Sequence, residues 1–216
     1  MEARNKGDRR SPVVFDAHPV ETHLQDGWEV VLSYANEDQG PLLVDLSHRR
    51  KWDIQHGSLA TARPWDIMFP ASPGQCRVEA GRLLSRRNFT QAAIWHLADD
   101  GSAAVPEPYF TEVTDGLCLL ALVGPQSFSV MEKVSSLDLT SPNSPPSFLV
   151  QGPVLDVPCQ VVVLEKNGET PVILMAFSRG YGQAMAEVLL ESGRVFGLRP
   201  GGENAFRKAL GALPAS

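Results

Sequence analysis

The apolar run Leu117-Cys-Leu-Leu-Ala-Leu-Val123 is the longest in the sequence and gives the strongest indication of the fold. Its length is that of a strand buried on both faces. It falls well short of the ~20 apolar residues that span a membrane. Gly124 and Pro125 end the run, and Ser127–Val134 then places apolar residues on or near one helical face. The stretch therefore predicts a central buried strand followed by a short helix.

Short β-branched, aromatic or alternating segments on either side predict further strands, and periodic segments predict helices. The expected strands are Trp28–Tyr34, Pro41–Asp45, Lys51–Gln55, Asn88–Leu97, and a hairpin of Val157–Glu165 and Val172–Phe177 turning at Asn167-Gly168. The expected helices are Leu59–Trp65 (with Ser58 as its N-cap), Tyr181–Gly193 and Asn204–Leu210. This order lacks the regular βαβα alternation of a parallel sheet, so it predicts an α+β fold of antiparallel sheets backed by helices.

Composition narrows the class of protein. The 216 residues carry a formal net charge of -6, which argues against nucleic acid or an anionic membrane as partner. The net charge is still compatible with binding of a small anion by a few local basic groups. The three cysteines are too few and too scattered for a disulfide framework, and no CxxC or His-rich tract indicates a metal site. We therefore expect a reduced, cytoplasmic protein without a structural metal.

The N-terminus is predicted to be solvated. Met1–Pro12 is charged, and no apolar segment follows it, so it does not resemble a signal peptide. We expect a flexible tail over residues 1–20 and a single domain over residues 21–213. Removing residues 1–12 is expected to leave thermal stability unchanged.

Two groups of residues could bind a ligand. His48, Arg49, Arg50 and Lys51 could hold a carboxylate or a phosphate, although on residue types alone a solvated charged turn is favoured. Trp95-His96 precedes Asp99 and Asp100, so His96 could act as a general base, although an ordinary strand-end histidine is favoured. The sequence contains neither a phosphate-binding glycine loop nor a GxSxG elbow, so no catalytic residue is assigned.

Several longer stretches resemble one protein family. PLLVDLSHRRKWDIQHGSLA (41–60) and FGLRPGGENAFRKAL (196–210) resemble the glycine cleavage T-protein, an aminomethyltransferase. LLALVGPQSFSVMEKVSSLDL (119–139), VPCQVVVL (157–164) and PVILMAFSRGYGQAMAEVLLESG (171–193) are more similar to its shorter relative, the gamma subunit of heterotetrameric sarcosine oxidase. The resemblance covers roughly Pro41 to Leu210, and the chain has the length of the sarcosine oxidase subunit.

The resemblance implies a T-protein-like folate-binding fold without the C-terminal barrel. Antiparallel sheets would carry helices on one side, in two pseudo-similar halves at about residues 21–115 and 116–213. A tetrahydrofolate site or its remnant would lie in a central cavity between them. The segments that match the lining of that cavity supply the cofactor-binding candidates: His48, Arg49, Lys51, Trp95, His96, Glu107 and Tyr109.

The chain departs from the family at its functional positions. The family's catalytic aspartate falls on Val105-Pro106, with Glu107 the nearest acid and out of register. The glutamate that grips the pteridine falls on Ile173, and Glu169 could reach over from the turn. The arginine that follows an alanine in the last helix falls on Phe206, one residue before Arg207. Unpartnered polar edges of a buried pterin would each cost ~1–3 kcal/mol.

The favoured hypothesis is a non-catalytic or altered folate-binding subunit of one-carbon metabolism, working with partner subunits of an oxidase or methyltransferase complex. One alternative is an active aminomethyltransferase or methyltransferase whose acid is re-sited at Glu107 or Asp115. The other is a ligand-free scaffold that binds another protein.

Overall fold

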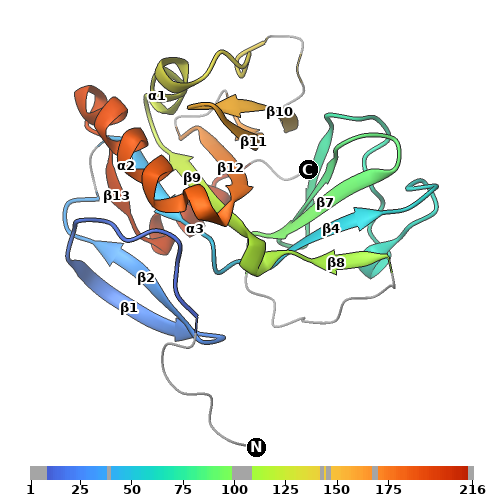
Figure 1. The fold of residues 1–216 in the computed structure, drawn as a ribbon, viewed down its shortest axis with the longest axis horizontal. Coiled ribbons are helices and arrows are strands. Elements are labelled where there is room, and N and C mark those ends of the chain that lie inside the picture. Colours follow the sequence, from blue (N-terminus) through green and yellow to red (C-terminus); the bar gives the residue numbers. More distant parts are fainter. Residues whose placement is uncertain are drawn as a thin grey trace, which may run out of the picture.

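The computed structural model describes residues 9–37, 40–98, 109–141, 144, 147–166 and 170–213. Its centre is a six-stranded sheet in which β9 (Leu117–Val123) lies between two neighbours, as the apolar run predicts (Figure 1). The order is β10 (Phe148–Val154), β11 (Val157–Glu165), β12 (Val172–Ser178), β9, β3 (Leu42–Asp45) and β13 (Arg199–Gly201). The pairs are antiparallel except for β3 with β13, which is parallel.

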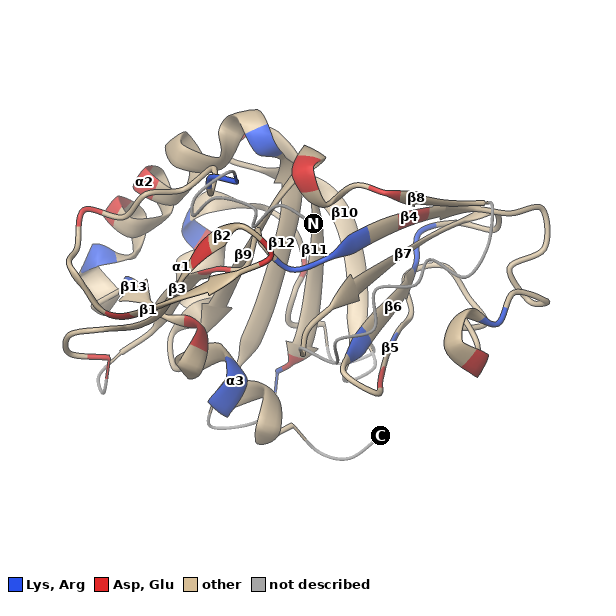
Figure 2. Cartoon of the chain, turned by 90° about the horizontal axis from the view of Figure 1, so that it is seen from below, with Lys and Arg blue, Asp and Glu red and all other residues tan. Residues whose placement is uncertain are grey.

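The two faces of β9 contribute to two different cores, because successive strand residues point to opposite sides. Cys118, Leu120 and Leu122 pack with α1 (Ser127–Val134) and α2 (Gly182–Gly193). Leu119, Ala121 and Val123 share a second core with α3 (Glu203–Gly211). Figure 2 shows α2 and α3 on opposite sides of the sheet. The α+β class is thus confirmed, with α3 placed opposite α1 and α2.

A five-stranded antiparallel sheet packs beside α3. Its order is β5 (Cys76–Glu79), β6 (Arg82–Arg86), β7 (Gln91–His96), β4 (Lys51–Gln55) and β8 (Phe110–Glu112). One face contributes Leu83, Ala93 and Trp95 to the core that includes α3. The other face holds a third core with Trp52 and Ile94, covered by the loop that contains the 3-10 helix η1 (Pro64–Asp66).

A hairpin of β1 (Pro19–Gln25) and β2 (Trp28–Tyr34) completes the molecule. Trp28 and Val30 of β2 are buried. Gly202, just before α3, lies against the backbone of Leu32, where an added Cβ would come within 2.3 Å of the Leu32 carbonyl carbon. Only glycine therefore allows this close approach between β2 and the start of α3.

Three further 3-10 turns connect the elements: η2 (Thr114–Gly116), η3 (Arg179–Tyr181) and η4 (Arg194–Phe196). In the described part of the chain, no helix has the length and apolar character needed to cross a membrane. The turns expected at Asp99-Asp100-Gly101 and Asn167-Gly168 lie outside the described residues. The division into two similar halves stays a prediction, although β3 of the first half pairs directly with β9 of the second.

The predicted helix Leu59–Trp65 is wrong. The segment forms turns that end in η1. Pro64 is the reason, since proline disfavours helical backbone at the residue before it, and Arg63 has φ -135 and ψ 66. The strands β1, β5, β6, β8, β10 and β13 were not predicted.

The predicted tail is wrong from Arg9 onward, and residues 1–8 lie outside the described residues. Val13 is 5% exposed and belongs to the core beneath α1 and α2. The side chain of Gln183 on α2 accepts a hydrogen bond from Val14 N at 2.8 Å and donates one to Val14 O at 3.1 Å. Ser11 Oγ donates to Asp45 at the end of β3. The burial of Val13 and these hydrogen bonds fix a segment whose composition alone predicts a solvated tail.

Candidate functional site

The charged segment between β3 and β4 is folded inward. Ser47 N donates to Asp45 Oδ1 at 2.9 Å, and Arg49 N donates to Leu46 O at 2.9 Å, so the chain turns sharply after β3. Arg49 is 2% exposed and Lys51 0% exposed. The solvated-turn interpretation is therefore wrong for these two side chains, and burying cations requires partners.

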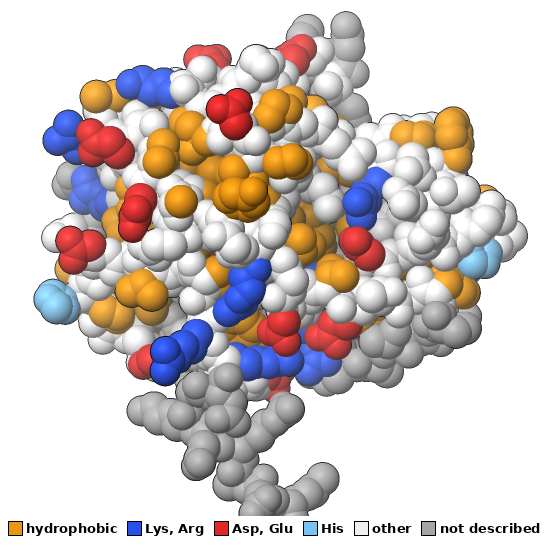
Figure 3. Space-filling model, in the orientation of Figure 1, with side chains coloured by type: hydrophobic (Ala, Val, Ile, Leu, Met, Phe, Trp, Pro, Cys, Tyr) orange, Lys and Arg blue, Asp and Glu red, His pale blue; other side chains and the backbone are white. Residues whose placement is uncertain are grey.

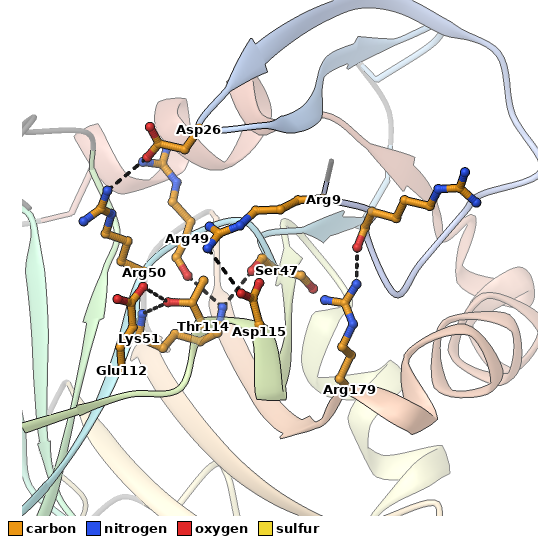
Figure 4. Close-up of polar contacts among 11 residues, drawn as sticks. Arg9, Asp26, Ser47, Arg49, Arg50, Lys51, Glu112, Thr114, Asp115 and Arg179 are labelled. Carbon is orange, nitrogen blue, oxygen red and sulfur yellow. Dashed lines mark hydrogen bonds and ion pairs between the residues drawn. The ribbon is translucent and has the colours of Figure 1, made fainter. Parts of the chain in front are cut away.

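Lys51 finds its partners within the turn itself. Its Nζ donates to Ser47 O at 2.8 Å and to Arg49 O at 2.7 Å, as Figure 4 shows. Its backbone N donates to Thr114 Oγ1 at 3.0 Å. Burial lowers the pKa of Lys51 to about 8, although Asp45 acts in the opposite direction. The ammonium group thus ties the turn together by bonding two of its carbonyl oxygens.

Arg49 and His48 reach a carboxylate from the other end of the chain. Arg49 forms an ion pair with Glu203, and His48 Nε2 lies 3.5 Å from Glu203 Oε1. Arg207 Nη2, one turn along α3, lies 3.3 Å from Glu203 Oε2. Glu203 is 1% exposed and is the first residue of α3, where the helix dipole also favours a negative charge. The carboxylate of this chain therefore occupies the position that an anionic ligand would take beside Arg49.

Trp95 and His96 point to opposite faces of the five-stranded sheet, because they are neighbours on β7. Trp95 is 1% exposed within the core shared with α3. The ring of His96 packs against Trp52 at 4.6 Å and against Trp65 at 5.6 Å between ring centroids. The guanidinium of Arg82 donates from Nε to His96 Nε2 at 3.3 Å and lies 4.5 Å from the centre of the Trp65 ring.

Tyr109 belongs with His96 rather than with the cations. It packs against His56 at 4.4 Å and against Phe110 at 5.0 Å, and it contacts the same third core as Trp52. Glu107 lies outside the described residues. The predicted site residues are thus divided between the junction of the two sheets (His48, Arg49, Lys51 and Trp95) and the outer face of the five-stranded sheet (His96 and Tyr109).

Described residues also line a small cavity and a larger groove. The cavity, of about 60 Å³, lies beside His48, Asp45, Tyr34 and Trp28, and it has room for a few water molecules but not for a pterin. Burial, Asp45 and Glu37 raise the pKa of Tyr34 to about 12, so its hydroxyl stays protonated. The other is a groove of about 510 Å³ along α2, and it includes none of the predicted site residues.

Sequence reasoning missed Glu203, the residue that completes the buried charge cluster. The available signal was an acidic residue directly after Gly201-Gly202 at a helix start, which is a common arrangement with no particular function. Thr114 Oγ1 accepts a hydrogen bond from Lys51 N and donates one to Glu112 Oε1 at 3.0 Å. Nothing in the sequence around Thr114 indicated this role. Asp115, one candidate for a re-sited acid, forms an ion pair of 3.2 Å with Arg9, and its side chain is 61% exposed.

No protein-family model matches the sequence, and no curated protein matches it. Several solved structures share the fold. A chain of the heterotetrameric sarcosine oxidase from Corynebacterium sp. U-96 aligns with TM-score 0.57 and 14% identity, over 71% of this chain and 84% of that one. The glycine cleavage system aminomethyltransferase T from Bartonella henselae aligns with TM-score 0.54 and 16% identity, over 88% of this chain and 57% of that one. The fold resemblance predicted from the sequence motifs is therefore confirmed, and this chain spans just over half of the aminomethyltransferase.

Proposed function

We propose that this chain is a non-catalytic subunit of one-carbon metabolism, which contributes a folate-binding-type fold to a heteromeric enzyme. The observation that carries the proposal is the structural match to 84% of one chain of a heterotetrameric sarcosine oxidase. The partner would be an oxidase or methyltransferase subunit, in the cytoplasm. A heteromeric role also agrees with the hydrophobic side chains that gather on one face of the molecule, as Figure 3 shows. Tyr181, just before α2, and Val188 on α2 are 51% and 44% exposed.

Three positions argue against independent catalysis. Ile173 and Phe206, which match the family's pteridine-binding glutamate and its arginine, are each 0% exposed within hydrophobic cores. Asp115 is paired with Arg9 at the surface rather than held in a cavity. Methylene transfer needs a carboxylate near the reacting nitrogen, and none of these three positions supplies a buried one.

Tetrahydrofolate is the ligand we propose for the site, bound more weakly than in an enzyme that keeps the family's residues. The cluster around Arg49 and His48 is a poor place for its anionic tail, because the tail would have to displace Glu203. Trp52 and His96 are buried, so the ring on which a pterin could stack is that of Trp65, which is half-buried and packs against both. These residues lie on the outer face of the five-stranded sheet, next to Tyr109.

Purification of the tagged full chain from its native host tests the subunit role. The expected result is co-elution with an oxidase or methyltransferase subunit through a high-salt wash. An untagged host lysate is the control for non-specific capture. Recovery of the chain alone, at normal expression, would contradict the proposal.

A second measurement separates binding from catalysis. Thermal unfolding of the isolated chain with tetrahydrofolate is compared with the variant Trp65→Ala, which removes the half-buried ring, and with Phe89→Ala, whose exposed ring lies at a hairpin turn. A ligand at 100 times its Kd adds ~2.7 kcal/mol of stability. We expect a small upward shift in the unfolding temperature that Trp65→Ala removes and Phe89→Ala keeps, with no aminomethyl transfer. Transfer by the isolated chain would refute the non-catalytic assignment, and no shift at any concentration would leave the chain as a scaffold without folate.

A further inference from the structure

Strand β1 is the most exposed strand of the molecule. Residues 19–24 are all exposed, and only Gln25 at its end is partly buried. It pairs with β2 on one side, and no strand in the described part of the chain pairs with its other side. In Figure 1 it forms the outer margin of the molecule, beyond β2. Such an edge presents backbone N–H and C=O groups that can pair with another strand.

In a single copy of the chain, β1 adds little to the stability of the hairpin. A two-stranded hairpin is marginally stable in water, and a third strand or a packed face is normally needed. β2 supplies the packed face through Trp28 and Val30, whereas β1 leaves Val20 68% and Leu24 43% exposed. The strand therefore keeps its apolar side chains and one backbone edge available.

The sequence of β1 is complementary to itself when read antiparallel. Around a two-fold axis at Thr22, Val20 of one copy lies opposite Leu24 of the other. Glu21 then lies opposite His23, so each acidic residue meets a basic or neutral donor rather than another acid. Each such cross-strand pair contributes roughly 0.2–1 kcal/mol, and the two-fold axis makes every pair occur twice.

We infer that two copies of this chain associate through antiparallel pairing of their β1 edges, centred on Thr22. The two hairpins would then form a four-stranded sheet in the order β2, β1, β1 and β2. The contact is isologous, so it closes at a dimer and leaves no free β1 edge. It uses neither the charge cluster around Glu203 nor the aromatic group around His96.

The association is reversible. Pro19 carries no N–H, and the register with β2 shifts on either side of Glu21, which limits the regular edge to a few residues. Such a strand pair buries less than the ~1,000 Å² of a stable interface. The dimer is therefore expected to form over the micromolar range rather than at trace concentrations.

Sedimentation velocity of the purified full chain, from about 5 µM to about 500 µM, tests the inference. The expected result for the natural sequence is a monomer–dimer equilibrium. His23→Glu places an acid opposite Glu21 in both pairs and is expected to raise the dimer Kd at least tenfold. The double variant E21K/H23E again sets opposite charges across the axis and is expected to restore the natural Kd.

Lys208→Glu is the control, because it introduces an acid at an exposed position on α3, outside β1. It is expected to leave the Kd unchanged. A natural chain that is monomeric up to the highest concentration overturns the inference. So does a double variant that dimerises as weakly as His23→Glu, or a control that weakens the dimer equally, since neither result is compatible with the Glu21–His23 register. Circular dichroism confirms that each variant is folded.

Discussion

Substituting Lys51 by methionine tests the buried turn between β3 and β4 most directly. Met has a similar length but cannot donate to Ser47 O and Arg49 O, which Lys51 Nζ contacts at 2.8 and 2.7 Å. Leaving two buried carbonyls without a donor costs about 1–3 kcal/mol each. Removing the buried charge stabilises the folded state by about 3 kcal/mol, because the pKa of Lys51 is lowered from 10.5 to about 8. We therefore expect Lys51→Met to lower the free energy of unfolding by about 1 kcal/mol at pH 7.

The difference should grow with pH. Because the folded state holds the Lys51 proton less tightly than the unfolded state, the unfolded state binds more protons between the folded pKa of about 8 and the unfolded value of 10.5. Stability from this group is thus constant below pH 8 and rises above it. The natural chain should gain about 2.5 kcal/mol relative to Lys51→Met between pH 7 and pH 10.

Urea unfolding followed by circular dichroism, at both pH values, measures this difference. Burial raises the pKa of Cys118 to about 12, and this thiol destabilises both proteins at high pH, so its effect largely cancels in the difference. Lys208→Met, at an exposed position on α3, is the control and should show no pH-dependent difference. If the difference in the free energy of unfolding between the natural chain and Lys51→Met stays constant or narrows from pH 7 to pH 10, the Lys51 ammonium is not buried as the structure shows.

Two further substitutions test the other buried contacts. Glu203→Gln leaves the guanidinium of Arg49 without its carboxylate and should cost about 3–5 kcal/mol in urea unfolding, whereas Glu191→Gln, in an exposed pair, should cost less than about 1 kcal/mol. Equal costs would show that the cluster around Glu203 is solvated. Val13→Ala should lower stability by about 2 kcal/mol because Val13 is 5% exposed, whereas Val14→Ala, 73% exposed, should stay within about 0.5 kcal/mol. A neutral Val13→Ala would restore the original expectation of a solvated tail.

The elements that local pattern determines were predicted well. Leu117–Val123 is apolar throughout because β9 is buried on both faces, and such a run leaves little alternative to a central strand. Ser127–Val134 matches α1 at both ends, since Gly124-Pro125 precedes it and its apolar spacing is helical. The resemblance to the sarcosine oxidase and T-protein folds rested partly on these segments.

The strands that were missed depend on pairing rather than on their own pattern. β6 has arginine at both ends, Arg82 and Arg86, and its strand state comes from its partners β5 and β7. β10 contains Gly152 and Pro153, which disfavour a strand interior, but it lies at the edge of its sheet, where proline is tolerated. Local propensity predicts neither strand, because the strand state of both segments depends on their position within the sheet.

The candidate site shows where a linear sequence misleads. The cations at residues 48–51 were recognised as a group, but their burial depends on Glu203, which lies more than 150 positions away and cannot be paired with them by spacing. Trp95 and His96 are adjacent in sequence, and strand alternation sends them to different cores. A ligand at the first group must displace an internal carboxylate, whereas a ligand on the outer face of the five-stranded sheet meets the half-buried rings of Trp65 and Tyr109. The outer face of the five-stranded sheet is therefore where folate binding should be sought, and the buried cluster is better understood as the joint that fixes α3 to the turn between β3 and β4.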